Sequence, residues 1–231
     1  MEYEYVSKAE YQPVREKLEK IIWNVHHYMS ANYGVTFQHR LIGSGKRHLI
    51  TRVKNGNKGF DFDYNFIVSD SIARSWCPKE LKTCFIDALS KTIRGTIYEN
   101  PNDSTSAITL KVVDRKNKII IHSCDFAIIY NELNDAKNEY YCLINHKQFG
   151  RYSFEKRNHS KNIDDKVDRI RQENGGWEMI KTEYLKLKNN NQDENKHSYS
   201  LYVEAVNNVY NHLFNQGLGL CVGWQTSPFF K

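Results

Sequence analysis

The chain has 231 residues, 40% of them hydrophobic and 26% charged, which suits a globular protein built as one large domain or two small ones. Its 33 lysines and arginines against 27 aspartates and glutamates give a net charge of +6, a weak indication of a polyanionic partner. No apolar run is long enough to cross a membrane, and the polar N-terminus lacks the apolar stretch of a secretory signal, so we expect a cytoplasmic protein without membrane attachment.

The cysteine pattern argues against two kinds of site. The five cysteines form no C-x-x-C pair, whereas disulfide frameworks and zinc sites favour even numbers and close spacing. Cys124 and Cys142 lie in strand-like runs, so we expect both to be buried, reduced thiols.

The first elements are a helix and a strand that leads into a glycine-rich turn. Ser7 and Glu10 are spaced as a capping box, and apolar residues at helical spacing follow as far as Gly34, which is typical of a helix end. Residues 35–42 are rich in β-forming side chains and lead directly into residues 43–45, Gly-Ser-Gly. The strand therefore presents this turn at its end.

A strictly alternating segment comes next. Residues 46–53 predict one or two helical turns, and residues 55–59, Asn-Gly-Asn-Lys-Gly, predict a turn. Residues 60–68, FDFDYNFIV, then alternate with the period of two that is typical of a strand with one apolar and one polar face. Asp61 and Asp63 lie on the polar face.

The rest of this half predicts a helix and three strands. Pro78 is a good first helical residue, and an apolar stripe continues from it towards Gly95. Residues 105–114 and 118–130 flank a short polar turn and indicate a hairpin, and residues 139–145 predict one more strand.

The C-terminal part has a different character. Apolar residues at helical spacing predict three helices, near residues 163–170, 177–187 and 201–213. We therefore expect an α+β fold, with a mixed α/β half over residues 1–145 and a mainly helical region over residues 146–231.

Three aspartates indicate the chemistry. On a strand, Asp61 and Asp63 point to the same face, with Cα atoms ~6.6 Å apart at a rise of ~3.3 Å per residue. Asp125 interrupts an apolar run, IIIHSCDFAIIY, where a charge is costly unless it is paired or bound to metal. Three such carboxylates suit a two-metal site for nucleotidyl transfer, and oxygen ligands favour Mg²⁺ or Mn²⁺. Two simpler explanations stay open: a salt bridge for Asp125 and a solvent-facing polar edge for the other two.

Residues 43–45 are a candidate triphosphate site. Glycine lets the backbone approach a phosphate closely, and the N–H groups of a following short helix can bind it, so we expect Gly43 and Ser44 to contact a nucleotide. Lys46 and Arg47 follow directly and are candidates for binding its phosphates. The segment is not a P-loop, because Arg47 stands where that motif requires serine or threonine.

Taken in chain order, these features resemble the DNA polymerase beta-like nucleotidyltransferase superfamily. The resembling pattern is a long helix, a strand that ends in Gly43-Ser44, a strand that carries Asp61 and Asp63, and a later strand that carries Asp125.

The resemblance implies a catalytic core over about residues 6–145 and a helical region that helps to bind nucleotide or acceptor. In that core the Gly-Ser turn would contact the triphosphate, the Asp-x-Asp pair would bind both metals, and Asp125 would complete the site and assist the attacking hydroxyl. One departure is the distance between Ser44 and Asp61, which exceeds the usual spacing of the motif; we attribute it to the turn at residues 55–59.

The acceptor is much less well defined, since fold and chemistry do not fix the substrate. Residues 146–161 interleave Phe149, Tyr152 and Phe154 with cations, a mixture that suits the bases and phosphates of RNA or of another nucleotide. The same aromatics could instead anchor this segment to the core, with the cations binding only the incoming triphosphate. The alternatives are a small-molecule antibiotic as acceptor, a protein or tRNA as acceptor, and a non-enzymatic domain that only binds nucleotide or RNA.

Overall fold

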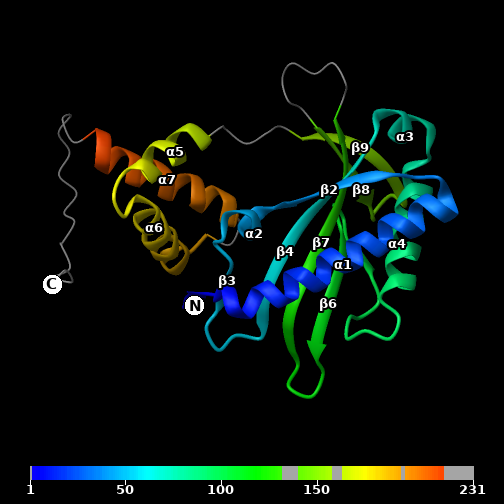
Figure 1. Ribbon diagram of the computed structural model, residues 1–231, viewed down its shortest axis with the longest axis horizontal. Helices are drawn as coiled ribbons and strands as arrows, with labels where there is room; N and C mark the ends of the chain where they lie inside the picture. Colours follow the sequence, from blue (N-terminus) through cyan, green and yellow to red (C-terminus); the bar gives the residue numbers. More distant parts are fainter. Residues whose placement is uncertain (1, 132–139, 158–162, 194–195, 216–231) are drawn as a thin grey trace. The chain divides into compact units, whose positions relative to one another are not determined.

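The computed structural model describes residues 2–131, 140–157, 163–193 and 196–215 (Figure 1). The chain forms two compact units, residues 1–161 and 162–231, which we describe separately. None of the helices in the described part of the chain combines the length and the apolar character needed to cross a membrane.

The first unit is built on a mixed seven-stranded sheet with the strand order β2-β4-β7-β6-β5, in which β8 also pairs with β7 and β9 pairs with β8. The strands are β2 (Phe37–Ile42), β4 (Lys58–Val68), β5 (Asn102–Asp103), β6 (Ile108–Asp114), β7 (Ile119–Asn131), β8 (Tyr140–His146) and β9 (Arg151–Arg157). β4 and β7 are parallel, while every other pair in this sheet is antiparallel. The predicted hairpin is confirmed as β6 and β7, and the mixed α/β fold class is confirmed with it.

Local signals set the ends of the long helices. Helix α1 (Lys8–Tyr33) begins after Ser7, whose side chain accepts a hydrogen bond from the backbone N–H of Glu10, as the capping box predicts. It ends at Gly34, which adopts a left-handed φ of 65°. Helix α4 (Pro78–Thr92) has its proline in the first turn, where the missing N–H costs no hydrogen bond.

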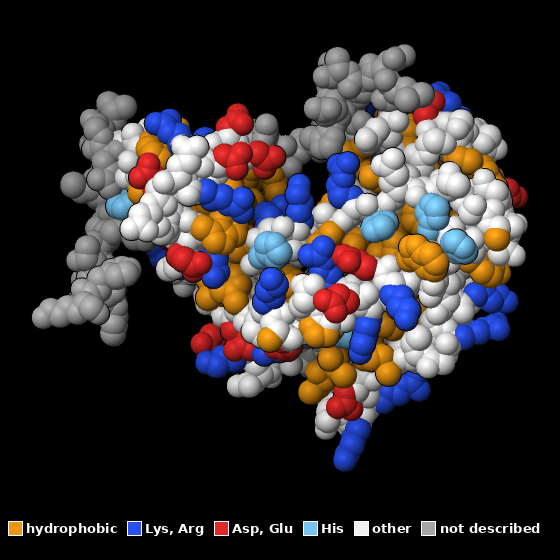
Figure 2. All heavy atoms as spheres, in the orientation of Figure 1, with side chains coloured by type: hydrophobic (Ala, Val, Ile, Leu, Met, Phe, Trp, Pro, Cys, Tyr) orange, Lys and Arg blue, Asp and Glu red, His pale blue; other side chains and the backbone are white. Residues whose placement is uncertain are grey.

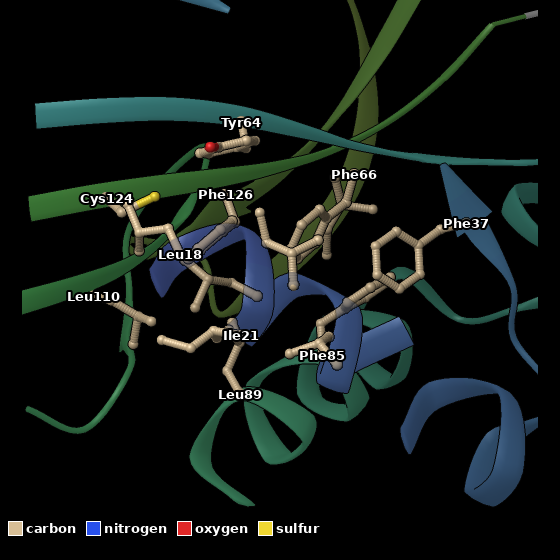
Figure 3. Close-up of a cluster of buried hydrophobic side chains, with 14 of the residues drawn as sticks. Leu18, Ile21, Phe37, Tyr64, Phe66, Phe85, Leu89, Leu110, Cys124 and Phe126 are labelled. Carbon is tan, nitrogen blue, oxygen red and sulfur yellow. The ribbon is translucent and has the colours of Figure 1, made fainter. Parts of the chain in front are cut away.

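One face of the sheet is covered by α1 and α4. The apolar side chains of β4 are buried there, and Phe66 stacks on Phe85 of α4 and on Phe126 of β7, with ring centroids 5.4 and 4.9 Å apart (Figure 3). Leu18 of α1 and Leu89 of α4 complete the same cluster. Each such side chain stabilises the fold by roughly 1.5–3 kcal/mol through burial. The polar side chains of β4 consequently lie on the opposite face.

Burial of two cysteines is confirmed. Cys124 on β7 is fully buried and Cys142 on β8 is 5% exposed, and both are free thiols. Each faces apolar packing in the sheet.

The segment after β2 differs from its prediction over residues 46–53. A five-residue helix, α2 (Gly43–Arg47), starts directly at the first glycine, and β3 (Thr51–Val53) then pairs with β1 (Tyr3–Tyr5). The β-branched residues of β3 have a strand partner far away in the sequence, which local periodicity does not reveal.

Residues 151–157 of the basic segment after β8 form a strand. β9 pairs with β8 along its whole length, from Tyr140 opposite Arg157 to His146 opposite Arg151. β9 therefore belongs to the first of the two compact units.

The second unit contains the three predicted helices: α5 (Asp164–Gln172), α6 (Gly176–Asn190) and α7 (Ser198–Phe214). Their apolar stripes are buried, with Ile170, Ile180 and Val209 fully enclosed. The turn between α5 and α6 requires glycine, because a Cβ on Gly176 would lie 2.0 Å from the carbonyl oxygen of Ile170.

Candidate active site

The three aspartates lie on the sheet face opposite the aromatic core. β4 carries Asp61 and Asp63 two residues apart, and the parallel register with β7 places Asp63 directly opposite Asp125 and Asp61 opposite Ser123. Asp61 is exposed, while Asp63 and Asp125 are half-buried. The structure therefore brings the three predicted carboxylates together on two neighbouring strands.

The glycine turn reaches the same place through the register of β2. Ile42, the last residue of β2, pairs with Asp63, so Gly43 is the next residue beside that carboxylate. Gly43 has a left-handed φ of 62°, and a Cβ on it would lie 2.3 Å from Oδ2 of Asp63. Only glycine allows the backbone to approach the carboxylate this closely.

Two hydroxyls orient the aspartates from β6 and β7. Ser123 Oγ donates to Oδ1 of Asp61 over 2.9 Å, and Thr109 Oγ1 donates to Oδ1 of Asp125 over 2.5 Å. Within the described residues, the partner of Asp125 is this hydroxyl rather than a lysine or an arginine. Neither hydroxyl was predicted from the sequence. Ser123 could have been found, since it lies two residues before Asp125 and therefore on the same face.

Negative and positive neighbours have opposite effects on the pKa of Asp63. Burial, and then the negative charges of Asp61 and Asp125, raise the pKa of Asp63 to about 7. The positive charge of Arg47 acts in the opposite direction. A bound cation would relieve both the burial cost and the repulsion.

The other residues of the turn have different environments. Arg47 is half-buried and acts electrostatically on Asp63, whereas Lys46 is exposed. Ser44 is half-buried, and its carbonyl accepts a hydrogen bond from the N–H of Leu49. Gly45 is buried, and a Cβ on it would lie 3.1 Å from the ring of Phe62, so its role is packing against the core.

The donor set suits a divalent metal. Carboxylate oxygens are the ligands that Mg²⁺ and Mn²⁺ prefer, and Mg²⁺ is usually held by one or two carboxylates together with substrate phosphates and water. In the ranges that the structure describes, no three His, Cys, Asp or Glu side chains form a complete metal cluster. A metal held here by one or two of the aspartates Asp61, Asp63 and Asp125 would need further ligands from substrate phosphates and water.

Some aromatic side chains of the basic segment pack against the core, and another is exposed to solvent. Tyr152 donates to Oδ2 of Asp103 over 2.7 Å, and the ring of Phe154 packs edge-on against Tyr130 at 4.9 Å. These two aromatics anchor β9 to the core, which was the alternative to base stacking that the sequence left open for them. Phe149 is 72% exposed. Lys161, at the end of the predicted basic stretch, lies outside the described residues.

Charges of both signs are interspersed on the surface. Figure 2 shows Lys and Arg side chains among Asp and Glu side chains over the visible face. On β9, Arg151, Lys156 and Arg157 are exposed together with Glu155.

Comparisons with known proteins identify the fold. No protein-family model matches the chain, and no curated protein matches it in sequence. Vibrio cholerae DncV cyclic AMP-GMP synthase, solved with non-hydrolysable GTP, matches with a TM-score of 0.54 and 13% identity, over 89% of this chain and 53% of that chain. Escherichia coli MS115-1 CdnC, solved with ATP, matches with a TM-score of 0.51 and 15% identity, over 90% of this chain and 62% of that chain. E. coli DncV bound to 3'-deoxy GTP matches with a TM-score of 0.52 and 14% identity, over 89% of this chain and 54% of that chain.

These neighbours are CD-NTases, which belong to the DNA polymerase beta-like nucleotidyltransferase superfamily. The present chain spans between 53% and 62% of their lengths. Its sheet and helices have the mixed α/β nucleotidyltransferase fold of the DncV-like structures.

Proposed function

We propose that this protein is a nucleotidyltransferase that moves a nucleoside monophosphate from a nucleoside triphosphate to an acceptor hydroxyl, with Mg²⁺ or Mn²⁺ held by Asp61, Asp63 and Asp125. The observation that carries the proposal is the parallel register of β4 and β7. It places Asp63 opposite Asp125, and Asp61 lies two residues before Asp63 on the same face of β4. The fold shared with neighbours that were solved with GTP and ATP supports it.

In the proposed step, the acceptor oxygen forms a bond to the α-phosphorus while the bond from that phosphorus to pyrophosphate breaks. Asp125 accepts the hydrogen bond of the acceptor hydroxyl and takes up its proton. The backbone of Gly43 and Ser44 holds the triphosphate beside Asp63, and Arg47 adds positive charge there. When bound, divalent cations neutralise the pyrophosphate and lower the pKa of the hydroxyl.

The direct test measures transfer of label. The protein is incubated with each α-labelled nucleoside triphosphate, Mg²⁺ or Mn²⁺, and either nucleotides or RNA as acceptor. We expect a labelled product that disappears with EDTA. Retained nucleotide binding without any product would instead support the non-enzymatic alternative.

A binding test separates the metal from the nucleotide. A triphosphate together with Mg²⁺ should raise the melting temperature, because a ligand that binds only the folded state stabilises it by mass action. Mg²⁺ or nucleotide alone should have a smaller effect. An equal shift in EDTA would contradict metal-dependent binding.

For the acceptor, we favour a second nucleotide over a long RNA. Tyr152 and Phe154 pack against the core and leave Phe149 as the exposed aromatic of the basic segment for stacking on bases. The neighbour named as a cyclic AMP-GMP synthase joins two nucleotides, which is consistent with a nucleotide acceptor here.

Charge neutralisation distinguishes the two acceptors. Arg151→Gln, Lys156→Gln and Arg157→Gln together should leave transfer to a mononucleotide nearly unchanged. If RNA is the acceptor, the triple variant should bind it more weakly. The salt dependence should also become shallower, by about 0.7 in log–log slope for each RNA phosphate that the variant no longer neutralises.

A matched variant controls for net charge. Arg115→Gln, Lys116→Gln and Lys118→Gln remove the same charge from exposed positions in the turn between β6 and β7. Equal weakening of RNA binding by both triple variants would indicate a general charge effect. Weakening by the β9 variant alone would identify RNA as the acceptor and overturn our preference for a nucleotide.

A further inference from the structure

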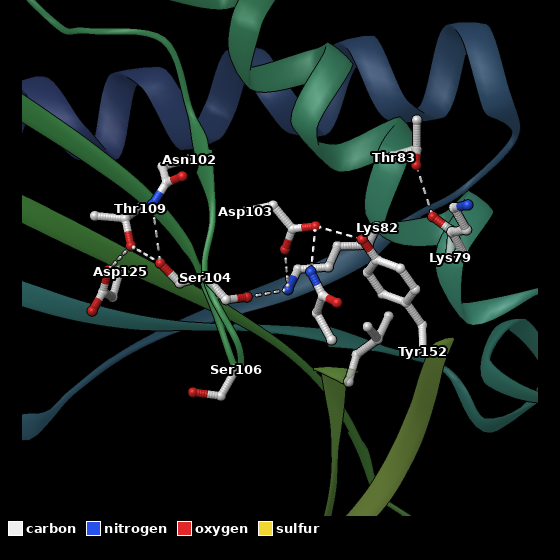
Figure 4. A network of polar contacts seen from close by, with 12 residues as sticks. Lys79, Lys82, Thr83, Asn102, Asp103, Ser104, Ser106, Thr109, Asp125 and Tyr152 are labelled. Atoms are coloured by element: carbon white, nitrogen blue, oxygen red, sulfur yellow. Dashed lines mark hydrogen bonds and ion pairs between the residues drawn. The ribbon is translucent and has the colours of Figure 1, made fainter. Parts of the chain in front are cut away.

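A chain of polar contacts connects Asp125 to the interior of the first unit (Figure 4). Its first link is Thr109, which is directly opposite Asp125 in the β6–β7 register and only 8% exposed. The Thr109 hydroxyl donates to Oδ1 of Asp125 over 2.5 Å. The bond fixes one carboxylate oxygen and thereby restricts rotation of the carboxylate.

The hydroxyl of Thr109 is itself oriented by Ser104. The two hydroxyl oxygens lie 2.9 Å apart. Since the single hydrogen of Thr109 is directed at Asp125, Ser104 must be the donor in this second bond. The backbone carbonyl of Ser104 in turn accepts a hydrogen bond from Nζ of Lys82 over 2.7 Å.

Lys82 is the buried end of the chain of contacts. Its side chain is 2% exposed and forms an ion pair with Oδ1 of Asp103 over 2.7 Å. Oδ2 of Asp103 accepts from Tyr152 Oη over 2.7 Å and from Asn145 Nδ2 over 2.9 Å. This network joins α4, β5, β8 and β9. Among the residues that the structure describes, Oδ1 of Asp103 has no partner with hydrogen-bond geometry and is held by the Lys82 ion pair alone, whereas Oδ2 accepts two hydrogen bonds. Breaking these buried contacts would be costly, so the network restricts the motion of its members.

We propose that Thr109 is a positioning residue that holds the Asp125 carboxylate in the orientation needed to bind the divalent cation, and that Ser104 and the buried Lys82–Asp103 pair hold Thr109 in place. The inference rests on the proposed nucleotidyl transfer at the aspartate site. Residues that orient metal ligands in this way typically contribute tenfold to a hundredfold in metal affinity or activity.

The decisive comparison is between Thr109→Val and Thr109→Ser. Valine keeps the shape and removes the hydroxyl, whereas serine keeps the hydroxyl. Thr109→Val should weaken Mn²⁺ binding, measured by the loss of the free Mn²⁺ signal in electron paramagnetic resonance with non-hydrolysable GTP present, by about tenfold to a hundredfold. It should lower kcat by a similar factor and change the KM for the triphosphate much less. Thr109→Ser should restore most of both.

Thr83→Val is a matched control. The Thr83 hydroxyl bonds to the carbonyl of Lys79 within α4 and has no connection to Asp125, so this variant should bind Mn²⁺ like the wild type. The effects should also decrease along the chain of contacts, from Thr109→Val through Ser104→Ala to Tyr152→Phe. Thermal unfolding of every variant separates loss of fold from loss of positioning. Ser104→Ala tests the same chain if Thr109→Val does not fold.

The outcomes separate this inference from the proposed function. Wild-type Mn²⁺ affinity in Thr109→Val, or failure of Thr109→Ser to restore it, would overturn the positioning role. The absence of metal binding in the wild type would overturn it as well. If Thr109→Val weakens Mn²⁺ binding but the wild type transfers no nucleotide, the positioning role stands and the proposed function fails.

Discussion

The two faces of β4 are formed by alternate residues of one segment, yet they have opposite effects on the stability of the fold. One face stabilises it and the other destabilises it. Phe62 and Phe66 are fully buried beneath α1 and α4, where burial stabilises the fold. On the other face, burial and two neighbouring carboxylates raise the pKa of Asp63 to about 7, so its charged form destabilises the fold without a cation. Stability therefore does not explain the aspartate face, and a cation bound as proposed above would offset its cost.

The polar character of that face is confined to one end. Further along the same strands, Ile67 and Ala127 pack against a small buried cluster that contains Ile129. The carboxylates are thus concentrated beside Gly43, where the backbone touches Asp63. Four substitutions or conditions test this contrast between the faces.

The largest expected effect is on the aspartate face. Asp63→Asn should abolish detectable transfer of an α-labelled nucleotide while the protein stays folded, because the substitution removes a charged oxygen ligand but almost no volume. Asn65→Ala, two residues along the same face, should retain most activity. Wild-type transfer by Asp63→Asn would refute the assigned site.

On the opposite face, Phe62→Ala should lower the free energy of unfolding by about 3–5 kcal/mol, because it leaves a cavity in the core. Denaturant unfolding measures the loss. Phe149→Ala, at a side chain that is 72% exposed, is the control and should cost less than about 0.5 kcal/mol. A cost below about 1 kcal/mol for Phe62→Ala would mean that this face does not carry the stability.

The pH dependence should reveal the cost of the aspartate face. Without metal, the folded pKa of Asp63, about 7, exceeds its ordinary value of 3.8, so the stability contributed by its protonated form is lost as pH rises from about 4 through 7. Asp63→Asn should therefore be more stable than wild type by about 4 kcal/mol at pH 8, since each pKa unit corresponds to ~1.4 kcal/mol, with the gap closing near pH 4.

His122 also titrates, and its effect must be removed from this comparison. Burial lowers the pKa of His122 to about 4. The folded state therefore loses stability as pH falls from about 6.5 through 4, and this loss is the same in both proteins. The difference between wild type and Asp63→Asn cancels this contribution. A gap that does not change between pH 4 and 8 would contradict the raised pKa of Asp63.

The smallest effect concerns the backbone beside the site. Gly43→Ala and Gly34→Ala both place a side chain at a left-handed φ, of 62° and 65°, and each should cost about 1 kcal/mol in unfolding free energy. A Cβ on Gly34 meets nothing within 4 Å, whereas one on Gly43 meets Asp63. Only Gly43→Ala should therefore reduce transfer, and equal activity in the two variants would show that the close approach is unimportant.

Local signals in the sequence determined much of the architecture. The period of two in residues 60–68 separates the aromatic face from the aspartates before any partner strand is known, because successive side chains alternate. The capping box at Ser7 and the left-handed position of Gly34 define α1, and the period of the apolar residues defines the three C-terminal helices. Each of these signals acts between residues that are close in the chain.

Only the tertiary structure decided how the strands meet. Asp114 faces Ile119 near the β6–β7 turn, and an unbroken ladder from there would place Thr109 opposite Cys124, on the wrong face. The bulge at residues 112–113 shifts the register by one residue and brings Thr109 opposite Asp125. The parallel pairing of Asp63 with Asp125 likewise depends on a crossover that no local pattern encodes. The sequence identified the carboxylates, while long-range register chose the hydroxyls that orient them, because a shift of one residue reverses the face to which every side chain points.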